Sequence, residues 1–187
     1  MSEHMPIMIG SGMIEKFIQF CQQNTFENFL IVADENTAPI LGDAVHQAVI
    51  QQGWDAIYVV LDPTGLHADD IPLSRVFNAY DAIPRLFVAV GSGTITDTTR
   101  FTSHRSQNQF VSFPTAASVD AYTSRVAPVT IGGLKGSVNC HPPIAIFTDM
   151  DVICDSPKFL TASGFGDLIA KLTSSADWKI TQLVWGA

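Results

Sequence analysis

The sequence predicts an α/β fold in which helices cover both faces of a parallel sheet. Five short apolar runs are continuous rather than alternating, which is typical of strands that are buried on both faces. Segments with apolar residues at three- and four-residue spacing lie between these runs, so strands and helices alternate along the chain. The chain has 187 residues, 47% of them hydrophobic, and is long enough to form one substantial core. The predicted strands are residues 29–33, 56–61, 86–90, 109–113 and 144–147.

Two amphipathic helices are predicted in the first part of the chain, over residues 13–23 and 38–52. Gly53 follows the second one, as is common where a helix ends. The pattern changes between residues 127 and 139, where apolar residues flank a glycine-rich run. This segment predicts an antiparallel hairpin appended to the sheet.

The end of the chain carries much apolar surface. A new helix is predicted to begin after Gly164, and the sequence then stops in the apolar tail 183–187. Two interpretations remain open: the tail packs back on its own sheet, or the chain ends in the middle of a fold. The predicted helix places five apolar residues on one face, namely Phe165, Leu168, Ile169, Leu172 and Ala176.

Charge and cysteine content exclude several classes of protein. The formal net charge is −8 and Lys plus Arg total 10, so no basic stripe is available for nucleic acid or an anionic membrane. Neither a signal peptide nor a membrane span is predicted, and we expect a cytoplasmic location. Cys21, Cys140 and Cys154 are widely separated, which argues against a disulfide framework or a cysteine metal cage. Cys154 lies in a loop-like run and is the one candidate for a reactive thiol.

The most informative motif is the turn at residues 90–97, where a buried run stops at Gly91-Ser92-Gly93 and opens into a helix. The start of a helix presents free backbone N–H groups and the positive end of its dipole to an anion. This motif predicts a phosphate site, and hence a nucleotide. The alternative is a strand-to-helix turn with nothing bound.

Four ordered motifs together resemble the glycerol-1-phosphate dehydrogenases, which belong to the iron-containing alcohol dehydrogenase and dehydroquinate synthase-like superfamily. The resemblance runs from about residue 7 to the end. It implies a Rossmann-like NAD(P)-binding α/β domain over residues 1–156. It also implies that residues 157–187 are the first helical segment of an incomplete C-terminal metal and substrate domain, which is all-helical in the family. The motifs are residues 91–97, 114–120, 142–146, and 160–167 with 176–179.

The resemblance assigns cofactor-binding roles to three segments. The glycine turn would hold the pyrophosphate of NAD or NADP through Gly91, Ser92, Gly93, Thr94 and Asp97. Asp34 would bind the adenosine ribose, although it is equally placed to cap the helix that follows. The nicotinamide half would lie over Thr115, Ala116, Ala117 and Ser118, with Ser124 as a further contact. For this segment the alternative is an ordinary exit from a strand.

The resemblance also assigns the residues that carry the chemistry. Asp120 would bind the substrate, and Asp167 would bind both the substrate and a divalent metal, usually zinc. The alternative for Asp167 is a helix N-terminal acid paired with Lys171. The other metal ligands of the family are histidines of the C-terminal domain, and none of the chain's histidines matches them: His4, His46, His67, His104 and His141.

Three features need separate interpretation. Ser92 replaces the middle one of the three consecutive glycines that are common in the family. Arg125 and Val126 replace a small residue and a proline. The acidic residues at 149, 151 and 155 lack the spacing of a calcium loop, and we interpret them as a solvated connection between a strand and a helix.

The resemblance implies a metal-dependent NAD(P) oxidoreductase that interconverts a glycerol phosphate and dihydroxyacetone phosphate. Because most of the helical domain is missing, we expect little activity and no stoichiometric metal from the chain alone. We expect a phosphorylated polyol as substrate and a homo-oligomer formed through the apolar end. Two alternatives are a nucleotide-binding remnant without catalysis and a lyase of the dehydroquinate synthase type.

Overall fold

The structure, a computed structural model, describes residues 5–186 of the chain. Six strands form one sheet in the order β1-β8-β5-β4-β2-β3, and every neighbouring pair is parallel. The predicted parallel α/β fold is therefore confirmed, with β1 as an additional edge strand. The strands are β1 (Ile7–Gly10), β2 (Asn28–Asp34), β3 (Asp55–Leu61), β4 (Leu86–Val90), β5 (Phe110–Phe113) and β8 (Ala145–Asp149).

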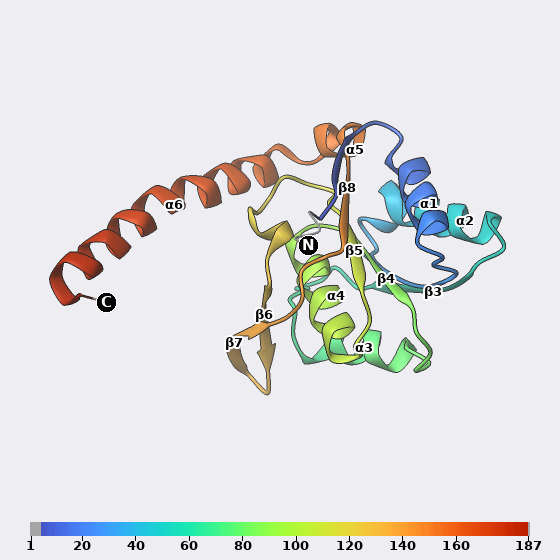
Figure 1. Cartoon of the computed structure of the whole chain (residues 1–187), viewed down its shortest axis with the longest axis horizontal. Coiled ribbons are helices and arrows are strands. Elements are labelled where there is room, and N and C mark those ends of the chain that lie inside the picture. Colours follow the sequence, from blue (N-terminus) through green and yellow to red (C-terminus); the bar gives the residue numbers. More distant parts are fainter. Residues whose placement is uncertain (1–4, 187) are drawn as a thin grey trace.

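Helices cover both faces of this sheet (Figure 1). Side chains of α1 and α2 join the apolar cluster on one face, and side chains of α3 and α4 join the cluster on the other. The helices are α1 (Met13–Gln23), α2 (Asp43–Gln51), α3 (Asp70–Ala79), α4 (Gly93–Arg105), α5 (Met150–Asp155) and α6 (Lys158–Trp185), with short turns η1 (Ala38–Gly42) and η2 (Ala121–Thr123).

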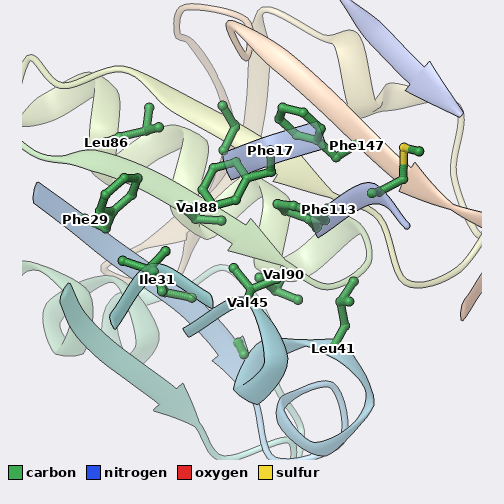
Figure 2. Packing of buried hydrophobic residues seen from close by; sticks show 14 of the residues in the cluster. Phe17, Phe29, Ile31, Leu41, Val45, Leu86, Val88, Val90, Phe113 and Phe147 are labelled. Carbon is green, nitrogen blue, oxygen red and sulfur yellow. The ribbon is translucent and has the colours of Figure 1, made fainter. Parts of the chain in front are cut away.

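Phenylalanines form the centre of the core between α1 and the sheet, as Figure 2 shows. The Phe17 ring is fully buried and meets the rings of Phe29, Phe113 and Phe147 edge-on, with centroids 5.2–5.9 Å apart. Edge-to-face pairs of this kind stabilise a fold by about 0.5–1.5 kcal/mol beyond the burial of their area. This packing fixes the strands whose carboxyl ends carry the predicted site.

The predicted hairpin is present as β6 (Val126–Ile131) and β7 (Leu134–Asn139), which pair antiparallel. It forms a two-stranded sheet of its own, and its inner side packs on Phe101 of α4 through Ala127 and Val129. The turn at residues 132 and 133 uses two glycines with positive φ, 58° and 77°. Glycine accepts these angles without the strain that a Cβ would cause.

Three details differ from the sequence-based expectations. The predicted helix 38–52 is divided into a single π-helical turn, η1, and α2, and it ends before Gly53, whose φ of 78° is typical of a helix-terminating glycine. Cys154 lies on α5 rather than in a loop, and it is exposed. The last helix begins at Lys158, directly after Pro157 at its N-cap, rather than after Gly164.

Helix α6 is 28 residues long and none of its residues is buried. It leaves the α/β body and extends away from it (Figure 1). The apolar tail therefore does not pack back on the sheet: Leu183 and Trp185 are 84% and 79% exposed. No helix within residues 5–186 is both long and apolar enough to cross a membrane.

Candidate functional site

The carboxyl ends of β2 and β4 meet at a point where the chain changes direction across the sheet. β2 pairs with β3 on one side and with β4 on the other. The connection after β2 leads to α2 on one face, whereas the turn after β4 leads to α4 on the opposite face. Open α/β sheets bind ligands in the crevice that such a divergence leaves.

A cleft of about 930 Å³ lies at this point. Four residues expected to bind the cofactor line it, from the ends of β2, β4 and β5: Asp34, Ser92, Thr115 and Ala116. Helix α5 and the first turn of α6 form another part of its wall, through Asp151, Val152, Asp155, Phe159 and Leu160. Asp151 and Asp155, which we interpreted from the sequence as a solvated connection, thus line the cleft.

The glycine turn, Gly91-Ser92-Gly93, connects the end of β4 to the start of α4 and borders this cleft through Ser92. A Cβ on Gly91 would lie 2.6 Å from the Cβ of Ile95, so a larger residue would push the turn away from its helix. The Gly91 N–H donates to the carbonyl of Phe113 at 3.0 Å, which holds the turn against β5. Ser92 precedes the helix without a capping bond from its side chain. Ser92 lines the cleft, so the N-terminus of this 13-residue helix borders it without a side-chain cap from Ser92, which suits an anion.

Asp34 is the last residue of β2. Its Oδ1 accepts hydrogen bonds from the backbone N–H groups of Asn36 and Thr37, both at 2.8 Å. These bonds hold a turn over residues 34–37 and do not cap the helix, because the N-cap of η1 is Thr37, which makes no side-chain capping bond. The Asp34 side chain also lines the cleft. The Thr37 hydroxyl donates to the carbonyl of Val90 at 3.0 Å and ties this loop to the end of β4.

A smaller cavity of about 200 Å³ gathers the residues expected to contact the substrate. Asp120 and Asp167 both line it, and the backbone N–H of Asp120 donates to Oδ2 of Asp167 at 2.9 Å. Lys171 pairs with Asp120, with Nζ 3.0 Å from Oδ2. The alternative interpretation of Asp167 had predicted that Lys171 would pair with Asp167 instead. The Asp120 carboxylate raises the pKa of Lys171.

Asp97 lines the same cavity as Gly93, but its carboxylate faces Arg100, one turn further along α4, at 2.5 Å. Burial raises the pKa of Asp97 to about 6, because desolvation outweighs the attraction of the guanidinium. Arg100 is completely buried. Sequence reasoning missed it, although its spacing of three residues from Asp97 is that of a helical ion pair.

The turn at residues 115–118 lies beneath α6. A Cβ on Gly164 would lie 2.0 Å from the carbonyl oxygen of Ala117, so only glycine allows the helix to pass this close. The Tyr122 hydroxyl donates to the carbonyl of Ala116 at 2.6 Å, and Ser118 is buried. Small residues are needed here because the backbone of α6 at Gly164 passes close to the backbone of the 115–118 turn.

Ser124 makes local hydrogen bonds: its hydroxyl accepts from the N–H of Val126 at 2.9 Å and lies 3.2 Å from the same residue's carbonyl. Thr94 lies partly exposed on the first turn of α4. Arg125 is exposed. The structure thus brings Asp34, Ser92 and the 115–116 turn to one cleft, and Asp97, Asp120 and Asp167 to a neighbouring cavity.

The described residues do not build a metal site on their own. Within residues 5–186, no three His, Cys, Asp or Glu side chains converge as a ligand set, and His4 lies outside this range. The rings of His104 and His141 approach to 5.2 Å without a third ligand. A metal ion at Asp167 would therefore need ligands from beyond the described residues.

Asp149 differs from the predicted solvated connection. It is 9% exposed, and its two carboxylate oxygens accept from the N–H groups of Met13 and Asp151, at 3.2 and 3.1 Å. These bonds cap α1 and α5 at once. The residue thus has a structural role that joins the first and last parts of the α/β body.

Comparison with known proteins places this sequence in a family. The sequence pattern of the family described as iron-containing alcohol dehydrogenase matches residues 8–157, which is most of the chain. The chain belongs to this family. The family resemblance that the four motifs indicated is therefore confirmed.

This iron-containing alcohol dehydrogenase family member has relatives about twice its length. It is 34% identical to the glycerol-1-phosphate dehydrogenase (NAD(P)+) of Bacillus velezensis over 96% of this chain and 46% of that protein. The chain thus spans about half the length of the curated relatives that it matches.

Solved structures share the fold of this family member. The glycerol dehydrogenase of Schizosaccharomyces pombe superposes with a TM-score of 0.75 at 21% identity, over 89% of this chain and 42% of that one. A 2-deoxy-scyllo-inosose synthase superposes with a TM-score of 0.72 at 18% identity, over 87% and 49% of the two chains. At these identities the likeness concerns the fold alone.

Proposed function

We propose that this chain is the nucleotide-binding part of an NAD(P)-dependent oxidoreductase that acts on a glycerol phosphate and dihydroxyacetone phosphate. The observation that carries this proposal is the convergence of Asp34, Ser92, Thr115 and Ala116, from three separate loops, on one cleft at the carboxyl edge of the sheet. Relatives named as glycerol-1-phosphate dehydrogenases support the substrate class.

The cofactor fits the residues that are present. The uncapped start of α4 would bind the pyrophosphate through backbone N–H groups, with Gly91 keeping the turn against its helix. Asp34 would accept from a ribose hydroxyl with the oxygen that does not cap the loop. The cofactor, when bound, would supply the hydride acceptor for oxidation of a secondary alcohol to a ketone, a reaction that also releases the hydroxyl proton.

The substrate would lie at the smaller cavity, beside Asp120 and Asp167. Carboxylates accept hydrogen bonds from polyol hydroxyls, and Lys171 brings a positive charge to Asp120. Asp167 is also our candidate for one ligand of a divalent metal, zinc by preference, in a protein that supplies the others. The segment 157–187 would then belong to a second domain.

Charge in the larger cleft favours NAD over NADP. Four carboxylate residues line it, Asp34, Glu35, Asp151 and Asp155, and the described lining contains no Lys, Arg or His. A 2′-phosphate would add a charge of about −2 beside these groups. We therefore expect NADPH to bind at least about tenfold more weakly than NADH at low salt.

The deciding experiment is a calorimetric titration of the chain with NADH and with NADPH. We expect weak but saturable binding of NADH, and its loss in Gly93→Asp, which places a carboxylate at the phosphate site. Gly136→Asp is the matched control, because a Cβ at that hairpin position meets no atom within 4 Å. Absence of heat with NADH up to millimolar concentration would overturn the proposal.

A non-catalytic nucleotide-binding protein is the second candidate, favoured by the incomplete ligand set in residues 5–186. The two are distinguished by elemental analysis after dialysis and by NADH consumption with dihydroxyacetone phosphate. We expect well under one metal ion per chain and no useful turnover from the chain alone. Tight zinc with turnover would show that another chain or a missed ligand completes the site.

A further inference from the structure

Arg100 is the largest side chain that is fully buried in the described structure. It lies on α4, one turn after Asp97, and it is not one of the residues that would touch the cofactor or substrate. A buried guanidinium is costly unless its donors are satisfied, and apolar residues of similar volume often replace buried ion pairs without loss of stability. Its presence therefore calls for a reason other than stability.

Three of the four hydrogen bonds that the Arg100 guanidinium donates lead to one segment. Nη1 donates to Asp97 and to the carbonyl of Val126 at 3.0 Å, while Nη2 donates to the carbonyls of Ala121 and Tyr122 at 2.9 and 3.2 Å. Three backbone carbonyls between residues 121 and 126 are thus held by one rigid group. Arginine alone among side chains offers a planar set of donors that can reach both ends of such a turn.

This segment begins directly after Asp120. The N–H of Asp120 donates to Asp167 and its carboxylate pairs with Lys171, so both contacts between the α/β body and α6 at this point depend on where residue 120 lies. Asp120 itself is exposed, and the 121–123 turn after it contains no buried residue. Little apolar packing is therefore available to fix its position.

We propose that Arg100 is a positioning residue for Asp120: it fixes the carbonyls that follow Asp120 and so holds that carboxylate between Asp167 and Lys171. The functional meaning of this role rests on the proposed function, in which Asp120 and Asp167 face the substrate. The positioning itself is measurable without any ligand.

The test compares Arg100→Met and Arg100→Lys with Arg85→Met by NMR. Arg85 is a matched control, because it is also buried and joins Asp55, Asp81 and the carbonyl of Phe29 elsewhere in the fold. Two signals are followed: hydrogen exchange of the Asp120 amide and the pKa of the Lys171 ammonium. Asp120→Asn provides the Lys171 pKa that is expected without the pair.

In both Arg100 variants we expect the Asp120 amide to exchange faster by about tenfold or more, while core amides of β4 stay protected. The pKa of Lys171 should fall toward its value in Asp120→Asn. Arg100→Lys keeps a charge for Asp97 but cannot hold all three carbonyls, so its effect should be smaller and in the same direction. Arg85→Met should lower stability and leave both signals unchanged.

Unchanged signals in a folded Arg100→Met or Arg100→Lys would overturn the inference. An equal change in Arg85→Met would also overturn it, because the effect would then follow from general loosening. Failure of the parent chain to bind NADH, with both signals responding as expected, would refute the proposed function and leave the positioning role intact.

Discussion

At the scale of single residues, Asp97 illustrates how burial and pairing compete. It forms an ion pair with Arg100, yet burial raises its pKa to about 6. The folded chain therefore binds a proton at this carboxyl more tightly than the unfolded chain does. The stability that this proton adds is fully present below about pH 4 and is lost as the pH rises through about 6.

We predict that the stability advantage of the parent over Asp97→Asn is larger near pH 4 than near pH 7, by about 1–3 kcal/mol. The asparagine cannot titrate, so the difference isolates this one group. Urea unfolding of both proteins at the two pH values measures it. An advantage that is larger near pH 7 would mean that Arg100, rather than burial, controls the pKa of Asp97.

The sequence allowed only part of the site to be predicted at this scale. Asp34, Ser92 and Thr115 could be placed together because each follows a predicted parallel strand, and the carboxyl ends of such strands share one edge. The roles of Arg100 and Tyr122 could not be predicted, because both side chains donate to backbone carbonyls that only the folded loops bring near them. Nothing in the identity of a residue indicates which carbonyls will lie near it.

At the scale of elements, the five predicted strands were found because each is a continuous apolar run. β1 was missed for a physical reason: it is a four-residue edge strand in which exposed Ile7 and Ile9 alternate with less exposed residues. Helix α6 was placed too late. It begins at Lys158 and runs through Gly164, which allows the helix to pass close to the Ala117 carbonyl oxygen.

That close approach gives a prediction at the element scale. Gly164→Ala should force α6 away from the 115–118 turn, because its Cβ would lie 2.0 Å from the Ala117 carbonyl oxygen. The bond from the Asp120 N–H to Asp167 should then weaken, and hydrogen exchange at that amide should accelerate about tenfold or more. Exchange detected by NMR or mass spectrometry provides the measurement.

Gly166→Ala is the control on the same helix, since a Cβ there meets no atom within 4 Å. It should leave the Asp120 amide unchanged and strengthen the helix by about 0.5–1 kcal/mol, the usual advantage of alanine over glycine. Similar behaviour of the two variants would show that α6 does not rest on the turn through Gly164.

At the scale of the whole molecule, the outstanding feature is the exposed apolar surface of α6. Leu172, Trp178 and Trp185 are each more than 70% exposed. Burying one such side chain stabilises an association by about 1.5–3 kcal/mol. We therefore predict that the chain forms oligomers or larger assemblies through this helix, with a two-fold pair as the simplest closed arrangement.

Light scattering over a range of concentrations measures this association. Leu172→Glu combined with Trp185→Ser should shift the chain toward monomer, whereas Ser175→Glu, a charged substitution at an exposed polar position of the same helix, should have a much smaller effect. A parent chain that is monomeric at all concentrations, with no change in the double variant, would contradict the prediction.

The pairing of β1 with β8 has a consequence for the order in which the chain folds. Ile7 lies beside Ile146 in the finished sheet, so β1 has no partner strand until β8, much later in the sequence, has been synthesised. At synthesis rates of about 5–20 residues per second, this interval lasts on the order of ten seconds. β2, β3 and β4 meet their neighbours much earlier. We therefore expect the sheet to grow outward from β2 during synthesis and the β1 edge to close last.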